Sequence, residues 1–203
     1  MGWSENNRKS FFQWLFGGSE LAPRVNLGDS DSGTSLDPFG APVFIDFEHH
    51  EIHEGDTYDT SYLLAVLANA GNLDLLLVTP AAILPHVVFS ATCGGDADLL
   101  LYEATVTTND GTPLPRRNKR RDSGKTAQVT SFHTPTVAGG SEGTLLFSVF
   151  LPGGEKNQAS GGSASSRSEW ILKSSTKYLL RLTNRAGAGK RASINAEWYE
   201  EDA

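Results

Sequence analysis

The feature that most constrains this chain is a series of short runs in which apolar and polar residues alternate, most of them separated by glycine, asparagine or proline. A period of two places every second side chain on the same face of an extended strand, so each run predicts a strand with one buried face. The runs expected as strands are Val43–Glu48, Thr57–Leu67, Leu73–Thr79, His86–Cys93, Ala97–Val106, Gln128–His133, Thr144–Leu151, Glu169–Leu172, Thr176–Thr183 and Arg191–Tyr199.

No helical period of useful length separates these runs, which argues against parallel βαβ units. The composition of Tyr62–Ala70 favours a helix, but its position between two strands favours β structure. The 21 glycines and 9 prolines agree with many turns. The sequence therefore predicts an all-β domain over residues 43–203, an antiparallel β-sandwich with a jelly-roll arrangement as the expected form.

Residues 1–42 have a different character and are expected to form an amino-terminal arm and linker. Glu5–Phe16 can form a short helix that Gly17 ends, and Ser19–Pro42 is rich in glycine, serine, aspartate and proline, as in an extended connector. The arm's large apolar residues are the types that dominate protein interfaces, so we expect them to bind a partner. They are Phe11, Phe12, Trp14, Leu15 and Phe16. Folding back onto the chain's own domain and lying at a membrane surface are the alternatives, although few basic residues accompany the apolar face.

The charges divide along the chain. There are 17 Lys and Arg against 24 Asp and Glu, a net charge of −7, which argues against general DNA coating. Residues 25–115 contain 14 acidic residues and no Lys or Arg, whereas residues 116–203 contain 14 basic and 8 acidic residues. Either the two halves neutralise each other within one domain, or the acidic part of one copy packs on the basic part of the next.

A basic cluster lies between two predicted strands, and we expect it to contact an acidic protein partner. It comprises Arg116, Arg117, Lys119, Arg120 and Arg121, with Lys125 close behind. A solvated loop is the alternative. Nucleic acid is disfavoured because no aromatic residue is interleaved for stacking on bases.

Signatures of catalysis and of cofactor binding are missing from the sequence. Ser123–Thr126 has the end of a phosphate-binding loop, but Lys119 stands where the motif needs its first glycine. His49, Glu51 and His53 would share a strand face, too far apart to hold one metal ion without help. The single cysteine, Cys93, is expected in the core, and no apolar run is long enough to cross a membrane. We expect a protein that is not an enzyme and needs neither cofactor nor metal.

Several blocks resemble one known group of proteins. They are IHEGDTYDTSY (52–62), GGDADLLLYEATV (94–106), FHTPTV (132–137), EWILKSSTKYLLRLTNRAG (169–187) and EWYEE (197–201). Together they resemble tailed-bacteriophage virion proteins of the capsid decoration, or cement, type. The resemblance extends over about Ile45 to Glu201 and leaves out residues 1–42.

The resemblance implies a structural protein without catalytic residues, synthesised in the host cytoplasm and bound to the major capsid protein at the capsid surface. It also implies a homotrimer. Two alternatives stay open: a component of the neck, tail or fibre, and a module that binds host-surface glycans. Exposed aromatic residues would serve the glycan module, and the candidates are Trp170, Tyr178, Trp198 and Tyr199.

Overall fold

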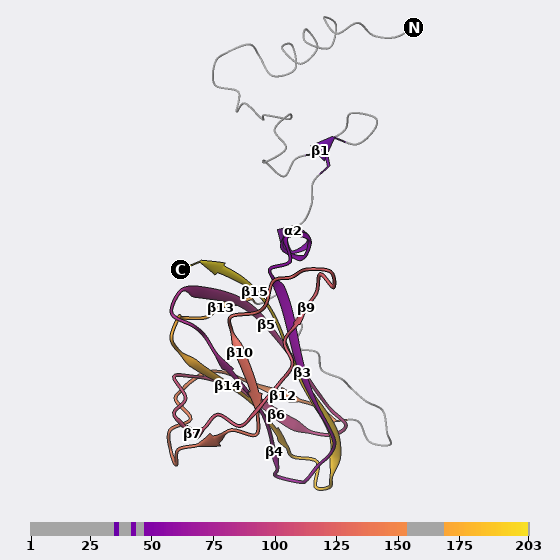
Figure 1. The fold of residues 1–203 in the computed structure, drawn as a ribbon. Helices are drawn as coiled ribbons and strands as arrows, with labels where there is room; N and C mark the ends of the chain where they lie inside the picture. Colours follow the sequence, from indigo (N-terminus) through magenta and orange to yellow (C-terminus); the bar gives the residue numbers. More distant parts are fainter. Residues whose placement is uncertain (1–34, 37–41, 44–46, 154–168, 203) are drawn as a thin grey trace, which may run out of the picture. The chain divides into compact units, whose positions relative to one another are not determined.

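The structure is a computed structural model that describes residues 35–36, 42–43, 47–153 and 169–202 (Figure 1). The chain divides into two units, Met1–Phe47 and Glu48–Ala203. In the first unit β1 (Ser35–Leu36) pairs antiparallel with β2 (Pro42–Val43), so part of the expected connector forms a small strand pair.

The second unit contains two antiparallel sheets packed as a sandwich, as predicted (Figure 1). The six-stranded sheet has the order β12-β6-β14-β4-β10-β8 and the five-stranded sheet has the order β13-β5-β15-β3-β9. The first sheet comprises β4 (Asn72–Val78), β6 (Ala97–Glu103), β8 (Thr112–Pro113), β10 (Thr130–His133), β12 (Thr144–Leu151) and β14 (Lys177–Asn184). The second comprises β3 (Thr57–Leu67), β5 (Ile83–Cys93), β9 (Arg117–Asn118), β13 (Trp170–Ile171) and β15 (Lys190–Asp202).

The long strands alternate between the sheets along the chain. From β3 to β6 each strand lies in the sheet opposite to the previous one, and the same holds from β13 to β15. Consecutive strands therefore face each other across the core rather than pair side by side, which makes the fold rich in contacts between residues distant in sequence.

The core lies between the sheets and is built from every second residue of each strand. In β15 Ile194, Ala196 and Trp198 are buried and alternate with half-buried Asn195 and Glu197. The Trp198 ring lies 6.0 Å from that of Tyr58 on β3, measured between ring centroids. The predicted core position of Cys93 is confirmed, because the side chain is buried and free.

The outer face of the six-stranded sheet carries a second buried layer. Leu76 on β4 and Leu179 on β14 are fully buried although their neighbours along each strand point into the core. The segment that contains β7 (Thr107–Asn109) and β11 (Thr136–Val137) contacts this face through ion pairs of Lys177 with Asp110 and of Arg181 with Glu142.

The prediction of a strand over Val43–Glu48 that continues through His49 and His53 is wrong. Val43 ends β2, residues 44–46 lie outside the described residues, and α2 (Phe47–Glu54) begins at Phe47, where the strand was expected to continue. The helix ends in a Schellman motif: Gly55, at a φ of 79°, donates its N–H to the Ile52 carbonyl at 3.2 Å, and Asp56 donates to the Glu51 carbonyl at 3.0 Å. Gly55 therefore stops a helix, whereas the alternation suggested a turn between strands.

The other strand predictions lie within a few residues of the structure, and Thr57–Leu67 and Thr144–Leu151 match it to the residue. The predicted β character of Tyr62–Ala70 is confirmed up to Leu67. The segment Thr107–Lys125, which lies between two predicted strands and contains the basic cluster, includes the short strands β7, β8 and β9.

Candidate partner-binding surfaces

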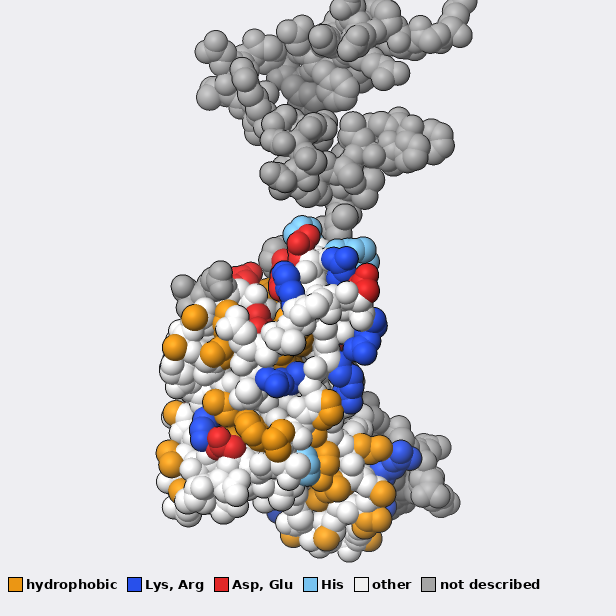
Figure 2. Space-filling view, in the orientation of Figure 1, with side chains coloured by type: hydrophobic (Ala, Val, Ile, Leu, Met, Phe, Trp, Pro, Cys, Tyr) orange, Lys and Arg blue, Asp and Glu red, His pale blue; other side chains and the backbone are white. Residues whose placement is uncertain are grey.

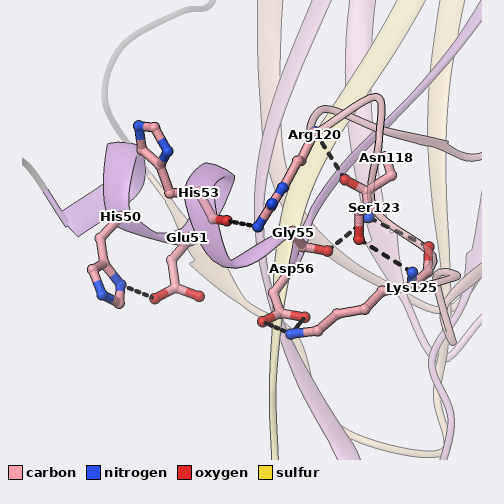
Figure 3. Close-up of polar contacts among 9 residues, drawn as sticks. All are labelled: His50, Glu51, His53, Gly55, Asp56, Asn118, Arg120, Ser123 and Lys125. Atoms are coloured by element: carbon pink, nitrogen blue, oxygen red, sulfur yellow. Dashed lines mark hydrogen bonds and ion pairs between the residues drawn. The ribbon is translucent and has the colours of Figure 1, made fainter. Parts of the chain in front are cut away.

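Of the two groups of residues expected to bind a partner, the structure describes one. The arm residues Phe11, Phe12, Trp14, Leu15 and Phe16 lie outside the described residues. The basic cluster lies in the segment 115–125, which we call the basic loop. It runs beside α2 and the start of β3 (Figure 3).

The basic loop is attached to the end of α2 by three side chains (Figure 3). Arg120 Nη1 donates to the carbonyl of His53 at 2.6 Å, and Asn118 Nδ2 donates to the carbonyl of Gly55 at 2.6 Å. Lys125 Nζ lies 2.9 and 2.7 Å from the two carboxylate oxygens of Asp56. The carbonyls at a helix carboxyl end carry partial negative charge, so cationic donors are favourable there.

The remaining basic side chains also have partners inside the domain. Arg116 Nη1 donates to the carbonyls of Ala127 at 3.2 Å and Val129 at 3.1 Å. Arg117 pairs with Asp59, and Lys119 pairs with Glu197. Arg121 Nη1 donates to the Asn118 carbonyl at 3.2 Å within the loop itself.

These contacts leave part of the cluster accessible. The side chains of Arg117 and Arg120 are about half exposed, whereas that of Lys119 is more than two-thirds buried. Asp122 pairs with Arg120, and the hydrogen bond from this guanidinium lowers the pKa of the Asp122 carboxyl. The cluster is thus a structural attachment that still presents guanidinium groups to solvent.

The acidic and basic halves of the sequence pair with each other within the domain. Basic residues of the second half pair with acidic residues of the first half on neighbouring strands and loops. These pairs are Arg117–Asp59, Lys125–Asp56, Lys173–Glu103, Lys177–Asp110, Arg181–Asp74 and Arg185–Asp98. Figure 2 shows the same intermixing, with Lys and Arg side chains beside Asp and Glu side chains at the α2 end of the domain. Of the two interpretations of the charge pattern, these contacts favour neutralisation within one domain.

The histidines lie on a helix rather than on a strand, which changes their relation. His49 and His53 are one helical turn apart, and their Nε2 atoms lie 2.9 Å from each other. His50 Nδ1 lies 3.5 Å from a carboxylate oxygen of Glu51 (Figure 3). Among the described residues no group of three or more His, Cys, Asp or Glu side chains is arranged to hold a metal ion.

A polar cluster that the sequence did not indicate joins β5, β13 and β15 at the outer face of the five-stranded sheet. His86 Nδ1 pairs with Glu169 and lies 2.7 Å from the hydroxyl of Tyr199, and its Nε2 lies 3.4 Å from Glu201. The Tyr199 hydroxyl donates to Glu169 at 2.5 Å. Burial, and then this hydrogen bond to a carboxylate, raise the pKa of Tyr199, so the phenol stays protonated as a donor. The cluster fixes the start of β13 against the sheet.

The structure also places the aromatic residues considered for glycan binding. Tyr178 and Trp198 are fully buried in the core. Trp170 is half-buried and packs against Phe147 with ring centroids 5.8 Å apart, and Tyr199 belongs to the His86 cluster. These four residues therefore do not form one exposed aromatic surface.

A third surface, which the sequence did not single out, follows β12. This strand ends the six-stranded sheet, and Leu145, Val149 and Phe150 on it are exposed. The apolar run of β12 predicts a strand, but it does not indicate that this strand lies at an edge. Which strands lie beside β12 depends on the topology of the whole sheet, and the sequence of a single strand does not determine that topology.

Comparison with known proteins finds no matching protein family, no matching curated protein and no matching solved structure. In the part of the chain that the structure describes, no helix has the length and apolarity to cross a bilayer.

Proposed function

We propose that this chain is a non-enzymatic structural protein of a tailed-bacteriophage virion, a capsid decoration protein that binds the major capsid protein and stabilises the head. Its β-sandwich would occupy the head surface, and the arm of residues 1–42 would extend to neighbouring capsid subunits. The protein would be made in the host cytoplasm and would need no cofactor.

The observation that carries this proposal is the order of the strands. Four consecutive strands of one sheet read β13-β5-β15-β3, and four of the other read β12-β6-β14-β4. Taken as the eight strands of two four-stranded sheets and numbered along the chain, this order supports a jelly-roll arrangement. We therefore propose the jelly roll as the finer description of the sandwich. Jelly rolls are frequent in viral capsid proteins, and fold-level analogy of this kind supports a function without fixing it.

The surfaces of the described residues support the same proposal. The charged residues mostly pair within the domain, whereas guanidinium groups of the basic loop and apolar side chains of β12 are left exposed. Contacts of this kind are individually weak, but many copies on a lattice gain strength by multivalency.

The test is cosedimentation of the purified full chain with expanded heads that lack it. We expect saturable binding to these heads and weaker binding after deletion of residues 1–18, because the arm's aromatic residues are removed. Arg121→Glu is expected to weaken binding as well, since the contact of Arg121 among the described residues is with the backbone of its own loop, which leaves its guanidinium able to meet a partner's carboxylate. Arg191→Glu is the matched control, an exposed arginine outside the basic loop. Failure of the intact chain to bind heads would contradict the proposal.

The alternative is a glycan-binding or fibre, neck or tail component of the virion. Jelly rolls also occur in lectins, so the proposed strand order favours this alternative as well. A glycan array read with the full chain separates the two. Saturable glycan binding together with no binding to heads would support the alternative.

A further inference from the structure

The two sheets of the described domain have four edge strands, and three of them are very short. β8, β9 and β13 each contain two residues, and β8 includes Pro113. β12 contains eight residues, Thr144–Leu151. Unpaired N–H and C=O groups along an edge pair readily with another strand, and proteins commonly protect edges with short strands, prolines or charges. β12 has neither a proline nor a charged residue.

The side chains of β12 are apolar toward both faces of the sheet. Leu145 and Phe150 lie opposite Tyr102 and Asp98 of β6 on the outer face, and they are 50% and 59% exposed. Val149 lies opposite the buried Leu99, so it points to the inner side, and it is still 38% exposed. On the inner side Trp170 of β13 packs against Phe147, and Val149 stays partly uncovered. An exposed apolar surface of this kind marks an interaction site.

The sequence that follows β12 contains few apolar residues. Residues 154–168 read GEKNQASGGSASSRS, and their only apolar side chains are two alanines. A partner for the edge must offer a strand that is apolar on both faces.

The two acidic residues of β6 that lie opposite β12 are both paired within the domain. Asp98 pairs with Arg185 at 2.7 Å, and Glu103 pairs with Lys173 at 2.7 Å. Two copies of β12 can therefore pair along Phe147–Leu151 without bringing together charged side chains of β12 or unpaired carboxylates of β6. A strand carrying Lys or Glu opposite Phe147–Leu151 would lose solvation of its charge.

We propose that β12 pairs antiparallel with β12 of a second copy across a two-fold axis, so that the six-stranded sheets of two copies form one continuous sheet. The register of β12 shifts between Leu145 and Phe147, so we place the pairing on Phe147–Leu151. The same surface serves both copies, and the contact closes on itself without forming an open chain of copies. It uses only this edge and does not depend on the proposed function in the virion. A trimer built through other faces is compatible with it.

Sedimentation equilibrium of the full chain over a range of concentrations tests the proposal. We expect a reversible association in which pairs form, and at least a tenfold weaker association for Ser148→Lys. Ser148 is exposed on the outer face, and two lysines would approach each other near the axis. Ala65→Lys, at an exposed position on β3, is the matched control and should associate like the parent chain. Ser148→Thr should also associate normally.

Hydrogen exchange on the unmodified chain gives a second readout that does not depend on variants. Amides of Phe147–Leu151 should exchange more slowly as the protein concentration rises through the association range. A chain that stays monomeric throughout, or an oligomer unaffected by Ser148→Lys whose β12 amides gain no protection, would overturn the proposal. So would an association that is lost on deletion of residues 1–34 and kept in Ser148→Lys, which would assign the contact to the arm.

Discussion

Replacing Glu200 is expected to destabilise the sandwich far more than replacing its neighbour Glu201. The Glu200 carboxylate, on β15, accepts hydrogen bonds from the N–H groups of Gln128 and Val129, each at 2.9 Å, and from Nε1 of Trp198 at 3.0 Å. Val129 immediately precedes β10 of the other sheet. One side chain therefore joins the two sheets and also satisfies the indole of the core tryptophan.

The magnitude follows from the donors that Glu200→Ala leaves without an acceptor. Val129 and Trp198 are buried, and a buried donor without a partner costs about 1–3 kcal/mol. For the two donors together this gives a range of about 2–6 kcal/mol. Because Glu200 is half-buried, water reaches part of the space it vacates, so we expect a loss in the lower half of that range, about 3 kcal/mol. Glu200→Gln keeps one acceptor oxygen and loses the charge, and should cost about half as much.

Urea denaturation followed by circular dichroism measures both effects. For Glu200→Ala we expect a downward shift of the midpoint of about 1–1.5 M with an unchanged slope. The Glu201 side chain is 45% exposed, and its ion pair among the described residues is with His86 at 3.4 Å, so Glu201→Ala should lie within about 0.5 kcal/mol of the parent. Equal stabilities of the Glu200→Ala and Glu201→Ala variants would refute the reasoning.

Three further predictions concern stability and the basic loop. Arg181→Met should lower the free energy of unfolding by about 3 kcal/mol, because it leaves the carboxylate of Asp74 without its partner. Arg181 contacts this carboxylate through Nε at 2.8 Å and Nη2 at 2.9 Å. Adding Asp74→Leu should restore part of the stability, which a double-mutant cycle measured by urea denaturation checks. Burial raises the pKa of Tyr58 and of Tyr178 from 10.0 to about 12, so the unfolded chain loses these protons first and the free energy of unfolding should fall between pH 10 and 12. Tyr178→Phe should make that fall shallower, and an unchanged pH profile would contradict the assignment. Arg120→Ala removes the hydrogen bond to the His53 carbonyl at the end of α2. Limited trypsin digestion should then cleave the basic loop faster than in the parent chain. An unchanged cleavage rate would show that this hydrogen bond does not hold the loop.

Much of the fold was predictable because it depends on alternation within single strands. Thr57–Leu67 and Thr144–Leu151 alternate or carry β-branched and aromatic residues, and both lie where expected. The helix α2 was missed because the alternation of Val43 and Ile45 was extended through Phe47, where helix-forming glutamates follow and Gly55 supplies the stop.

The interaction surfaces were less predictable because they depend on neighbours in space. Arg116–Arg121 were correctly seen as one cluster, but their acceptors, such as the His53 carbonyl, come from a helix that the sequence did not indicate. The exposure of β12 follows from its place at the end of the sheet. That place is not encoded in the eight residues of β12 themselves.

A cryo-electron microscopy reconstruction of the virion whose genome carries this sequence tests the central claim most directly. The account predicts density for the two-layered sandwich at repeated positions on the outer surface of the head. A virion whose head surface lacks the chain, or one that carries it in the tail alone, would contradict the assignment to capsid decoration.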